Sequence, residues 1–264
     1  YSIDPIGCTD IDDAISIRKD NEVEEYAVHI SNPTLWYENM SEIDKLSNNQ
    51  TTSIYTNRNI YHMIPKILST DKASLKENEV RNCISVIWSI CKSNGSLSTR
   101  VVSTSIMNRK NYSYDEFDNE EHSDLYELFN KIWNTKPENS HDLIEKSMIS
   151  ANEYVAKYLC ENIKERRNIL LRKTVNNGAW YLPYSNSCSN SHDLINGNIY
   201  THFTSPIRRY ADQIIHRQLM SLINNDECNS KLDIDTIIRM NVVKTKAKQI
   251  ESELKWVSIA KPNQ

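Results

Sequence analysis

The stretch SIDPIGCTDIDDAIS, Ser2–Ser16, gathers four aspartates within ten residues and contains neither lysine nor arginine. These four residues are Asp4, Asp10, Asp12 and Asp13. Two unit charges about 5 Å apart repel each other by roughly 3 kcal/mol at an effective dielectric constant near 20. A fold that brings the carboxylates together must therefore protonate some of them or bind a cation. The alternative is a solvated acidic loop in which the side chains point apart.

The spacing of the aspartates favours convergence in an irregular turn. In a regular strand Asp10 and Asp12 would share one face and Asp13 would point to the other. Pro5 and Gly7 favour bends that let all the carboxylates meet. Convergent carboxylate oxygens suit Mg²⁺, with Mn²⁺ as the alternative, rather than zinc. Because two such ions roughly 4 Å apart are a known arrangement for cleaving phosphate esters, the cluster predicts phosphodiester hydrolysis.

Alternating apolar and polar residues follow the acidic stretch. Ala14–Asp20 and Glu24–Ser31 predict one hairpin. Residues 83–107 predict a second, with Asn94 and Gly95 as a primed turn. Strands therefore come first and helices later, which favours an α+β fold.

Helical periodicity begins at Tyr114 and is predicted in four segments. These are Tyr114–Trp133, Ser140–Arg167 with Ser140 as N-cap, Ser205–Asn224 with Pro206 in the first turn, and Asp233–Ile259. The polar, irregular residues 173–198 predict a long loop.

The composition limits the classes of partner. With 264 residues, a net charge of -4 and a pI near 6.0, the chain needs a local basic groove to bind nucleic acid. Its six cysteines include no CxxC pair, which predicts reduced thiols and a cytoplasmic location. No apolar run approaches the roughly 20 residues of a membrane span, so no membrane partner is expected.

A second motif, YTHFTSPIRRYADQIIHR, Tyr200–Arg217, combines groups that bind phosphate. Three of its side chains can donate hydrogen bonds to phosphate oxygens: His202, Thr204 and Ser205. Ser205 stands at a predicted helix start, where free backbone N–H groups favour an anion. Arg208 and Arg209 carry guanidinium forks that hold phosphate at two points. The alternative is a surface helix with two solvated arginines.

Together, the two motifs make the chain resemble the RNB catalytic domain of the ribonuclease II, ribonuclease R and exosome-nuclease family. Segments between them also resemble the family: residues 29–37, 51–86, 103–117 and 148–159. The resemblance extends over residues 1–264 as a single catalytic domain. It implies an RNB-type α+β fold, with a mixed or antiparallel sheet flanked by helices.

The resemblance implies a metal-dependent exoribonuclease that hydrolyses single-stranded RNA from the 3′ end and releases 5′-mononucleotides. The matching acidic set would hold magnesium ions and, through them, the attacking water: Asp4, Asp10, Asp12 and Asp13. Asp12 and Asp13 are thereby also expected to be catalytic. Arg208 matches the arginine that steadies charge developing on the scissile phosphate. Arg209, His202, Thr204 and Ser205 are expected to contact the RNA.

Other expected site residues come from the middle of the chain. Tyr114 matches a tyrosine near the terminal nucleotides that bears on product length, and Tyr55 matches an aromatic residue that contacts a base. Stacking contributes about 1–3 kcal/mol per base. Core packing is the alternative for both tyrosines. Where the family usually has an acidic residue this chain has Lys146, and the neighbouring Glu145 is expected to contact the RNA instead.

Two other readings stay open. One is a catalytically inactive RNB-fold module that binds RNA, because nuclease folds are reused for binding. The other is a subunit of an RNA-processing assembly. Family members carry OB-type domains around this domain, which implies that flanking domains or a partner chain supply part of the RNA binding.

Overall fold

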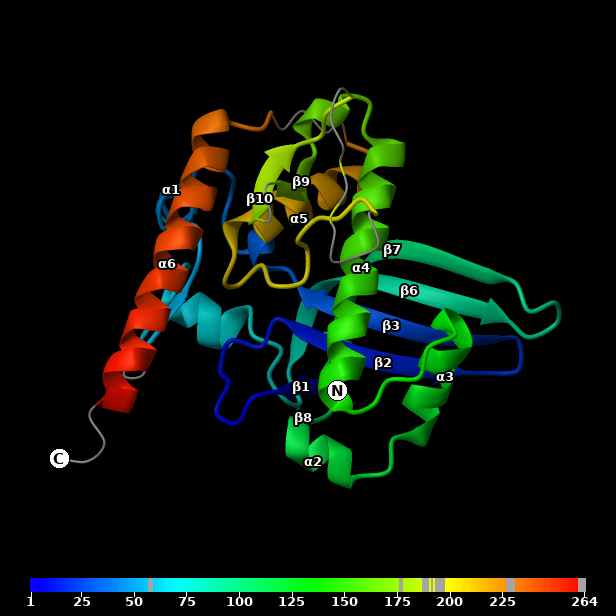
Figure 1. Ribbon diagram of the computed structural model, residues 1–264. Helices are drawn as coiled ribbons and strands as arrows, with labels where there is room; N and C mark the ends of the chain where they lie inside the picture. Colours follow the sequence, from blue (N-terminus) through cyan, green and yellow to red (C-terminus); the bar gives the residue numbers. More distant parts are fainter. Residues whose placement is uncertain are drawn as a thin grey trace.

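The computed structural model describes residues 1–56, 59–175, 178–186, 190, 192, 198–226 and 231–260, except for the side chains of 255–260. A four-stranded antiparallel sheet with strand order β2-β3-β6-β7 lies at its centre (Figure 1). Its strands are β2 (Asp13–Lys19), β3 (Val23–Ser31), β6 (Val80–Cys91) and β7 (Leu97–Met107). Both predicted hairpins are confirmed, because β2 pairs with β3 and β6 with β7.

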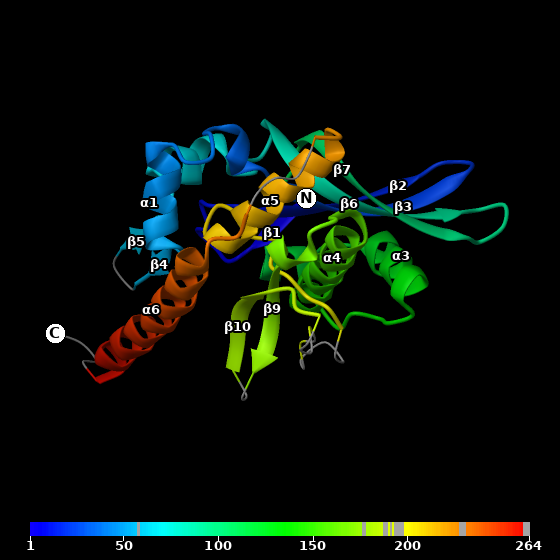
Figure 2. The ribbon, with the colours of Figure 1, turned by 90° about the horizontal axis from the view of Figure 1, so that it is seen from above.

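Two helices, α3 (Ser123–Trp133) and α4 (Ser140–Asn162), cover one face of this sheet (Figures 1 and 2). Alternation along β3 turns Tyr26, Val28 and Ile30 toward this face, and all three side chains are fully buried. The Tyr26 hydroxyl lies 2.7 Å from the Ser147 hydroxyl of α4. The period-two pattern of the sequence therefore decides which face of the sheet becomes the core.

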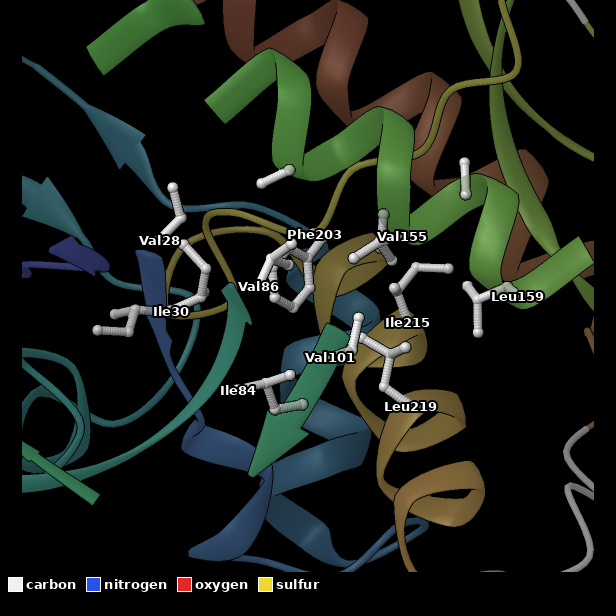
Figure 3. Packing of buried hydrophobic residues seen from close by; sticks show 14 of the residues in the cluster. Val28, Ile30, Ile84, Val86, Val101, Val155, Leu159, Phe203, Ile215 and Leu219 are labelled. Carbon is white, nitrogen blue, oxygen red and sulfur yellow. The ribbon is translucent and has the colours of Figure 1, made fainter. Parts of the chain in front are cut away.

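The core continues from the sheet into the C-terminal half of the chain (Figure 3). Phe203 lies between the sheet and the helices, and Ile215 and Leu219 reach the same cluster from α5 (Tyr210–Ile223). Fully burying an apolar side chain of this size contributes about 1.5–3 kcal/mol. This packing holds the segment around Phe203, and thus the second motif, against the sheet that carries the first.

The remaining elements surround this core. Short strands pair as β1 (Ser2–Asp4) with β8 (Asn111–Ser113), β4 (Ile54–Tyr55) with β5 (Ile60–Tyr61), and β9 (Leu170–Val175) with β10 (Gly178–Pro183). The other helices are α1 (Glu42–Gln50), α2 (Tyr114–Asn119) and α6 (Ile234–Ala260), with short turns of helix at Pro33–Leu35, Leu68–Lys72 and Arg166–Asn168. The predicted α+β class, with an antiparallel sheet flanked by helices, is confirmed.

The expected primed turn at Asn94 and Gly95 is wrong. Five residues, 92–96, connect β6 with β7. Of Asn94 and Gly95, only Gly95 has a positive φ, 71°. The Asn94 side chain accepts a hydrogen bond from the Ser96 N–H at 2.9 Å. This local bond favours a longer loop over a two-residue turn.

Two helix boundaries also differ from the prediction. Asn139, not Ser140, caps α4, because its side chain accepts the Asp142 N–H at 3.0 Å. The helix ends at Asn162 instead of Arg167, since Ile163 turns into an extended, buried conformation. The segment predicted as one helix over 114–133 is broken between α2 and α3.

The predicted loop over residues 173–198 is wrong in its first part. Residues 173–175 belong to β9 and residues 178–183 form β10, its antiparallel partner. The aromatic and apolar residues of Gly178–Pro183, GAWYLP, are typical of a strand. Later in the segment, residues 187–189, 191 and 193–197 lie outside the described part of the chain.

The helix predicted to begin at Ser205 begins at Tyr210 instead. The Asp212 carboxylate accepts the Ser205 N–H at 2.8 Å, and the Gln213 amide donates to the Pro206 carbonyl at 2.8 Å. These side chains of the first helical turn reach back and hold Ser205–Arg209, the SPIRR loop, in a turn. No helix in the described residues is both long and apolar enough to span a membrane.

Candidate active site

A cavity of about 910 Å³ lies between β1, α4, β9 and α6, and residues from both ends of the chain line it. It brings together all the site residues predicted from the sequence: Asp4, Asp10, Asp12, Asp13, Tyr55, Tyr114, Glu145, His202, Thr204, Ser205, Arg208 and Arg209. Groups nearly two hundred residues apart in sequence therefore share one pocket, as the two motifs require.

The aspartates reach the cavity through an irregular turn, as their spacing predicts. Asp4 ends β1, whose pairing with β8 fixes its position. Gly7 then adopts a φ of 83°, which favours glycine, and the Cys8 N–H donates to the Pro5 carbonyl at 3.0 Å. Asp13 begins β2. The turn thus places carboxylates from two strands and their connection on one side of the cavity.

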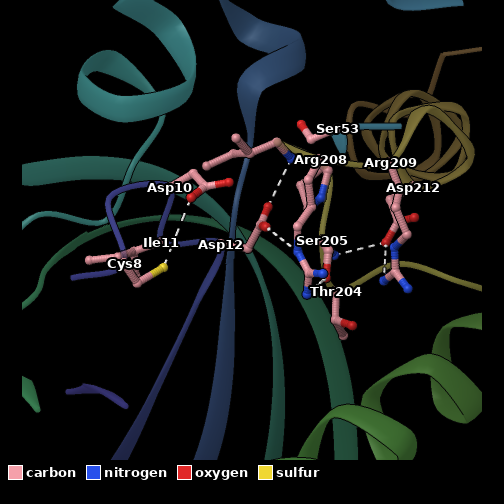
Figure 4. Close-up of polar contacts among 12 residues, drawn as sticks. Cys8, Asp10, Ile11, Asp12, Ser53, Thr204, Ser205, Arg208, Arg209 and Asp212 are labelled. Atoms are coloured by element: carbon pink, nitrogen blue, oxygen red, sulfur yellow. Dashed lines mark hydrogen bonds and ion pairs between the residues drawn. The ribbon is translucent and has the colours of Figure 1, made fainter. Parts of the chain in front are cut away.

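Asp12 joins the acidic turn to the SPIRR loop (Figure 4). Its side chain is 3% exposed, and its Oδ1 accepts the Ile207 N–H at 2.8 Å. Its Oδ2 lies 3.2 Å from Nε of Arg208. Burial raises the pKa of Asp12 to about 7, while Arg208 and the Ile207 N–H act in the opposite direction. Both oxygens of this carboxylate are therefore engaged within the protein.

Asp4 and Asp13, in contrast, are compensated only in part, because the stabilising effects of Arg208 and other neighbours do not outweigh their burial. Oδ2 of Asp4 is buried and has no hydrogen-bond donor among the described residues. Burial raises the pKa of Asp4 to about 6. Burial, followed by the charges of Asp4 and Asp12, raises the pKa of Asp13 well above its usual value. This side of the cavity thus carries more negative charge than the protein neutralises.

Asp10 is held by Tyr55, whose hydroxyl donates a short hydrogen bond to Oδ2 of Asp10. The Tyr55 N–H in turn donates to the Glu251 carboxylate of α6 at 3.2 Å. Burial raises the pKa of the Tyr55 hydroxyl, and the bond to Asp10 adds to this effect. Tyr55 therefore orients an aspartate of the cluster. The sequence predicted a contact with a base for Tyr55 and did not predict this bond to Asp10.

The aspartates suit a divalent cation in charge and in donor type. The unpartnered oxygen of Asp4 and the raised pKa of Asp13 are the observations that support this fit. Within the described ranges, however, no three His, Cys, Asp or Glu side chains have their donor atoms gathered for a metal ion. Binding would thus require side chains that line the cavity to rearrange.

The SPIRR loop is fixed from several sides. The Ser53 N–H donates to the Arg208 carbonyl at 3.0 Å, and Nη2 of Arg208 donates to the Ser205 hydroxyl at 3.0 Å. Nη2 of Arg209 pairs with Asp212 at 2.8 Å. Because Asp212 also takes the Ser205 N–H, the anion site expected at that backbone group is wrong. No local pattern around Asp212 predicts that it holds this loop.

Further predicted residues lie along the cavity wall. The Tyr114 ring stacks on His141 of α4, with 3.5 Å between centroids and 10° between planes. Glu145 lines the cavity, whereas Lys146 pairs with Asp142 at 2.7 Å. The acidic group thus faces the cavity even though the matching position holds lysine.

His202 and Thr204 are tied to neighbouring side chains on the same wall. Nδ1 of His202 lies 2.6 Å from the Tyr181 hydroxyl, and burial lowers its pKa well below the usual value. The Asn152 amide of α4 donates to the Tyr200 hydroxyl at 2.9 Å and to the Thr204 hydroxyl at 3.4 Å. Asn152, which was not among the predicted site residues, therefore orders this wall.

Comparison with known proteins agrees with this geometry. The family model of the RNB domain matches residues 1–125 and 161–225, more than half of the chain. The chain is 27% identical to the mouse exosome complex exonuclease RRP44, over 85% of the chain and 34% of that protein. It is 24% identical to ribonuclease R of Chlamydia pneumoniae, over 97% of the chain and 51% of that protein.

Solved structures share the fold. The Mycoplasma genitalium RNase R in complex with ribose methylated single-stranded RNA matches with a TM-score of 0.78 at 19% identity, covering 96% of this chain and 56% of that one. Yeast Ssd1, a pseudonuclease, matches with a TM-score of 0.81 at 18% identity, covering 96% and 43%.

The chain spans about a third to a half of the length of these curated relatives. The match of the family model includes both the acidic turn and the SPIRR loop, the two segments that meet in the cavity. The chain belongs to the RNB domain family.

Proposed function

We propose that this chain is the catalytic domain of a metal-dependent exoribonuclease that hydrolyses single-stranded RNA from its 3′ end and releases 5′-mononucleotides. The observation that carries the proposal is the contact between Asp12 and Arg208 in a cavity lined by the other aspartates. The names of the similar proteins, an exosome exonuclease and ribonuclease R, support the same reaction.

The four aspartates would hold Mg²⁺, or alternatively Mn²⁺, and the bound ion would supply activation of the attacking water. The protein contributes the rest. Nε and Nη2 of Arg208 are held by Asp12 and Ser205, and its side chain remains 46% exposed. Its remaining N–H groups are therefore aimed by fixed partners and can meet a scissile phosphate beside the carboxylates.

The lining of the cavity supports the proposal of an RNA strand that is bound without sequence preference. Stacked Tyr114 and the apolar side chains of Ile144 and Met148 offer surfaces for bases, and no element of the site described above offers a pattern that selects one base. We propose that residues 1–264 form one catalytic domain. Flanking domains or a partner chain would add OB-type binding to RNA, and the cytoplasmic location remains a prediction.

A catalytically inactive RNA-binding module is the second candidate. It is favoured by the lack of a gathered three-ligand group among the described residues and by the similar fold of the pseudonuclease Ssd1. The unpartnered Asp4 oxygen and the position of Arg208 favour the enzyme instead.

One assay separates the candidates. 5′-Labelled single-stranded RNA is incubated with the protein and Mg²⁺, beside an EDTA control and an Asp13→Asn variant. Progressive shortening that is lost in both controls supports the exoribonuclease. RNA that stays intact but shifts in a native gel supports the binding module. RNA that is neither cut nor shifted with Mg²⁺ or Mn²⁺ at low salt contradicts both.

A further inference from the structure

The cavity is also lined by cationic side chains that the reaction above does not use. Arg172 enters from β9, and Lys244 and Lys248 enter from α6. Arg209, the last residue of the SPIRR loop, lines the same cavity. In Figure 1, β9 and β10 lie on the opposite side of this region from β1, which carries Asp4. The cavity therefore has a basic as well as an acidic lining.

Arg172 differs from the other cationic residues of the cavity. The residue is only 3% exposed, and Nη1 of its guanidinium is buried with no hydrogen-bond acceptor among the described residues. The guanidinium lies 4.6 Å from the centre of the Tyr181 ring, a cation–π contact that supplies no hydrogen-bond acceptor to Nη1. A buried charge without a partner is costly, and folds usually avoid it.

Neighbouring groups do not provide an acceptor for Nη1 of Arg172. Arg209 gives Nη2 to Asp212, and its Nε is itself buried without an acceptor in the described part of the chain. Burial lowers the pKa of Arg172, and the nearby charge of Arg209 lowers it further. The Asp212 carboxylate thus pairs with Arg209 and not with Arg172, and the nearby Tyr200 hydroxyl is already engaged by Asn152.

We propose that Arg172, together with Arg209, binds a backbone phosphate of the RNA one or more linkages away from the scissile phosphate. The inference rests on the function proposed above and adds a second anion subsite to the same cavity. A guanidinium fork with free N–H groups matches two phosphate oxygens. Lys244 and Lys248, which form no ion pair with the described residues, continue this basic strip along α6.

The test measures binding without cleavage, in EDTA, using single-stranded oligonucleotides in which one phosphate is replaced by a neutral methylphosphonate. The replacement is moved one linkage at a time from the 3′ end. For the wild-type protein, we expect one inner linkage at which neutralisation weakens binding about tenfold, the size of a lost charged hydrogen bond. For Arg172→Gln, the unmodified strand should bind about tenfold more weakly, and that linkage should no longer matter.

Salt dependence and matched variants sharpen the test. Arg172→Gln should lower the slope of log affinity against log salt by about 0.7, the value for one phosphate contact on a single strand. Arg172→Lys keeps the charge and should keep most of the slope while losing affinity. The control is Arg167→Gln, whose side chain is 77% exposed and paired with Glu165, and it should change neither quantity.

The outcomes distinguish the subsite from the function itself. An Arg172→Gln protein that binds RNA with wild-type affinity and an unchanged linkage profile overturns the subsite and leaves the exoribonuclease standing. If this variant fails to fold, the wild-type scan decides, because a scan with no sensitive inner linkage also overturns the subsite. A wild-type protein that binds no RNA overturns the proposed function as well.

Discussion

Two buried acidic regions of this molecule use their carboxylates in opposite ways. Asp44 of α1 is 1% exposed, and its Oδ1 accepts from Arg217 at 2.6 Å and from the Tyr210 hydroxyl at 3.0 Å. Its Oδ2 accepts the Met40 N–H at 2.9 Å. In the cavity, Asp4 keeps an unpartnered buried oxygen. A satisfied carboxylate stabilises the fold, whereas an unsatisfied one leaves a coordination position for a ligand.

The largest expected contrast comes from replacing one carboxylate in each region. Asp13→Asn should lower the rate of RNA hydrolysis by at least about 100-fold, because it removes a ligand and a charge from the metal site. It should also stabilise the metal-free protein, since it relieves repulsion from Asp4 and Asp12. Asp44→Asn should destabilise the fold by roughly 3 kcal/mol and leave the rate per folded molecule unchanged.

Urea unfolding in EDTA and single-turnover rates measure these two properties separately. The contrast between the two regions fails if both variants lose stability, or if Asp44→Asn lowers the rate of fully folded protein.

A second effect tests the link between the acidic turn and the SPIRR loop. Arg208→Ala should lower kcat about 100- to 1000-fold, as for loss of a donor aimed at developing charge, while changing Kd for RNA only a few-fold. Arg208→Lys keeps the charge but loses the bond geometry at Asp12 and Ser205, so it should recover only part of the rate. Losses of similar size in kcat and affinity would instead assign Arg208 to ground-state binding.

A smaller effect, whose direction is set by the raised pKa of Asp4, is expected in the pH dependence of the unfolding free energy. Folding raises the pKa of Asp4 from 3.8 to about 6, so the folded state favours its protonated form. The stability that this group contributes is therefore present below pH about 4 and is lost as the pH rises through about 6. In EDTA, the wild type should lose unfolding free energy relative to Asp4→Asn over this range.

Urea titrations of both proteins between pH 4 and 8 measure the difference, and Mg²⁺ at pH 8 should restore the wild type but not the variant. A difference in unfolding free energy between the two proteins that is constant with pH would show that folding does not raise the pKa of Asp4.

The smallest expected change concerns product length. Tyr114 stacks on His141 at one wall of the cavity, so Tyr114→Ala should lengthen the limit product and leave the rate on long RNA within a few-fold. Tyr158→Ala, near the C-terminal end of α4 and not part of the cavity lining, is the control and should leave the product unchanged. Denaturing gels of 5′-labelled RNA resolve the products. An unchanged product assigns Tyr114 to packing.

The parts of this structure that the sequence could reveal are those with a local pattern. Alternation identified the main hairpins, and the two dense polar motifs identified residues that the fold gathers in one cavity. Helix starts were misplaced where a side chain several residues away captured a backbone N–H, as Asp212 does at Ser205. Arg172 was not predicted because an arginine beside Lys173 in a short strand has no local signal, and only the buried Nη1 without an acceptor among the described residues marks it.

The contact between Asp12 and Arg208 joins residues separated by 196 positions along the chain. A ribosome that has just produced the acidic turn must therefore add every residue between the two before the guanidinium arrives. Until then the newly made segment holds only half of the contact that joins the two motifs. The site described here is thus complete only after both segments have been translated and have folded together.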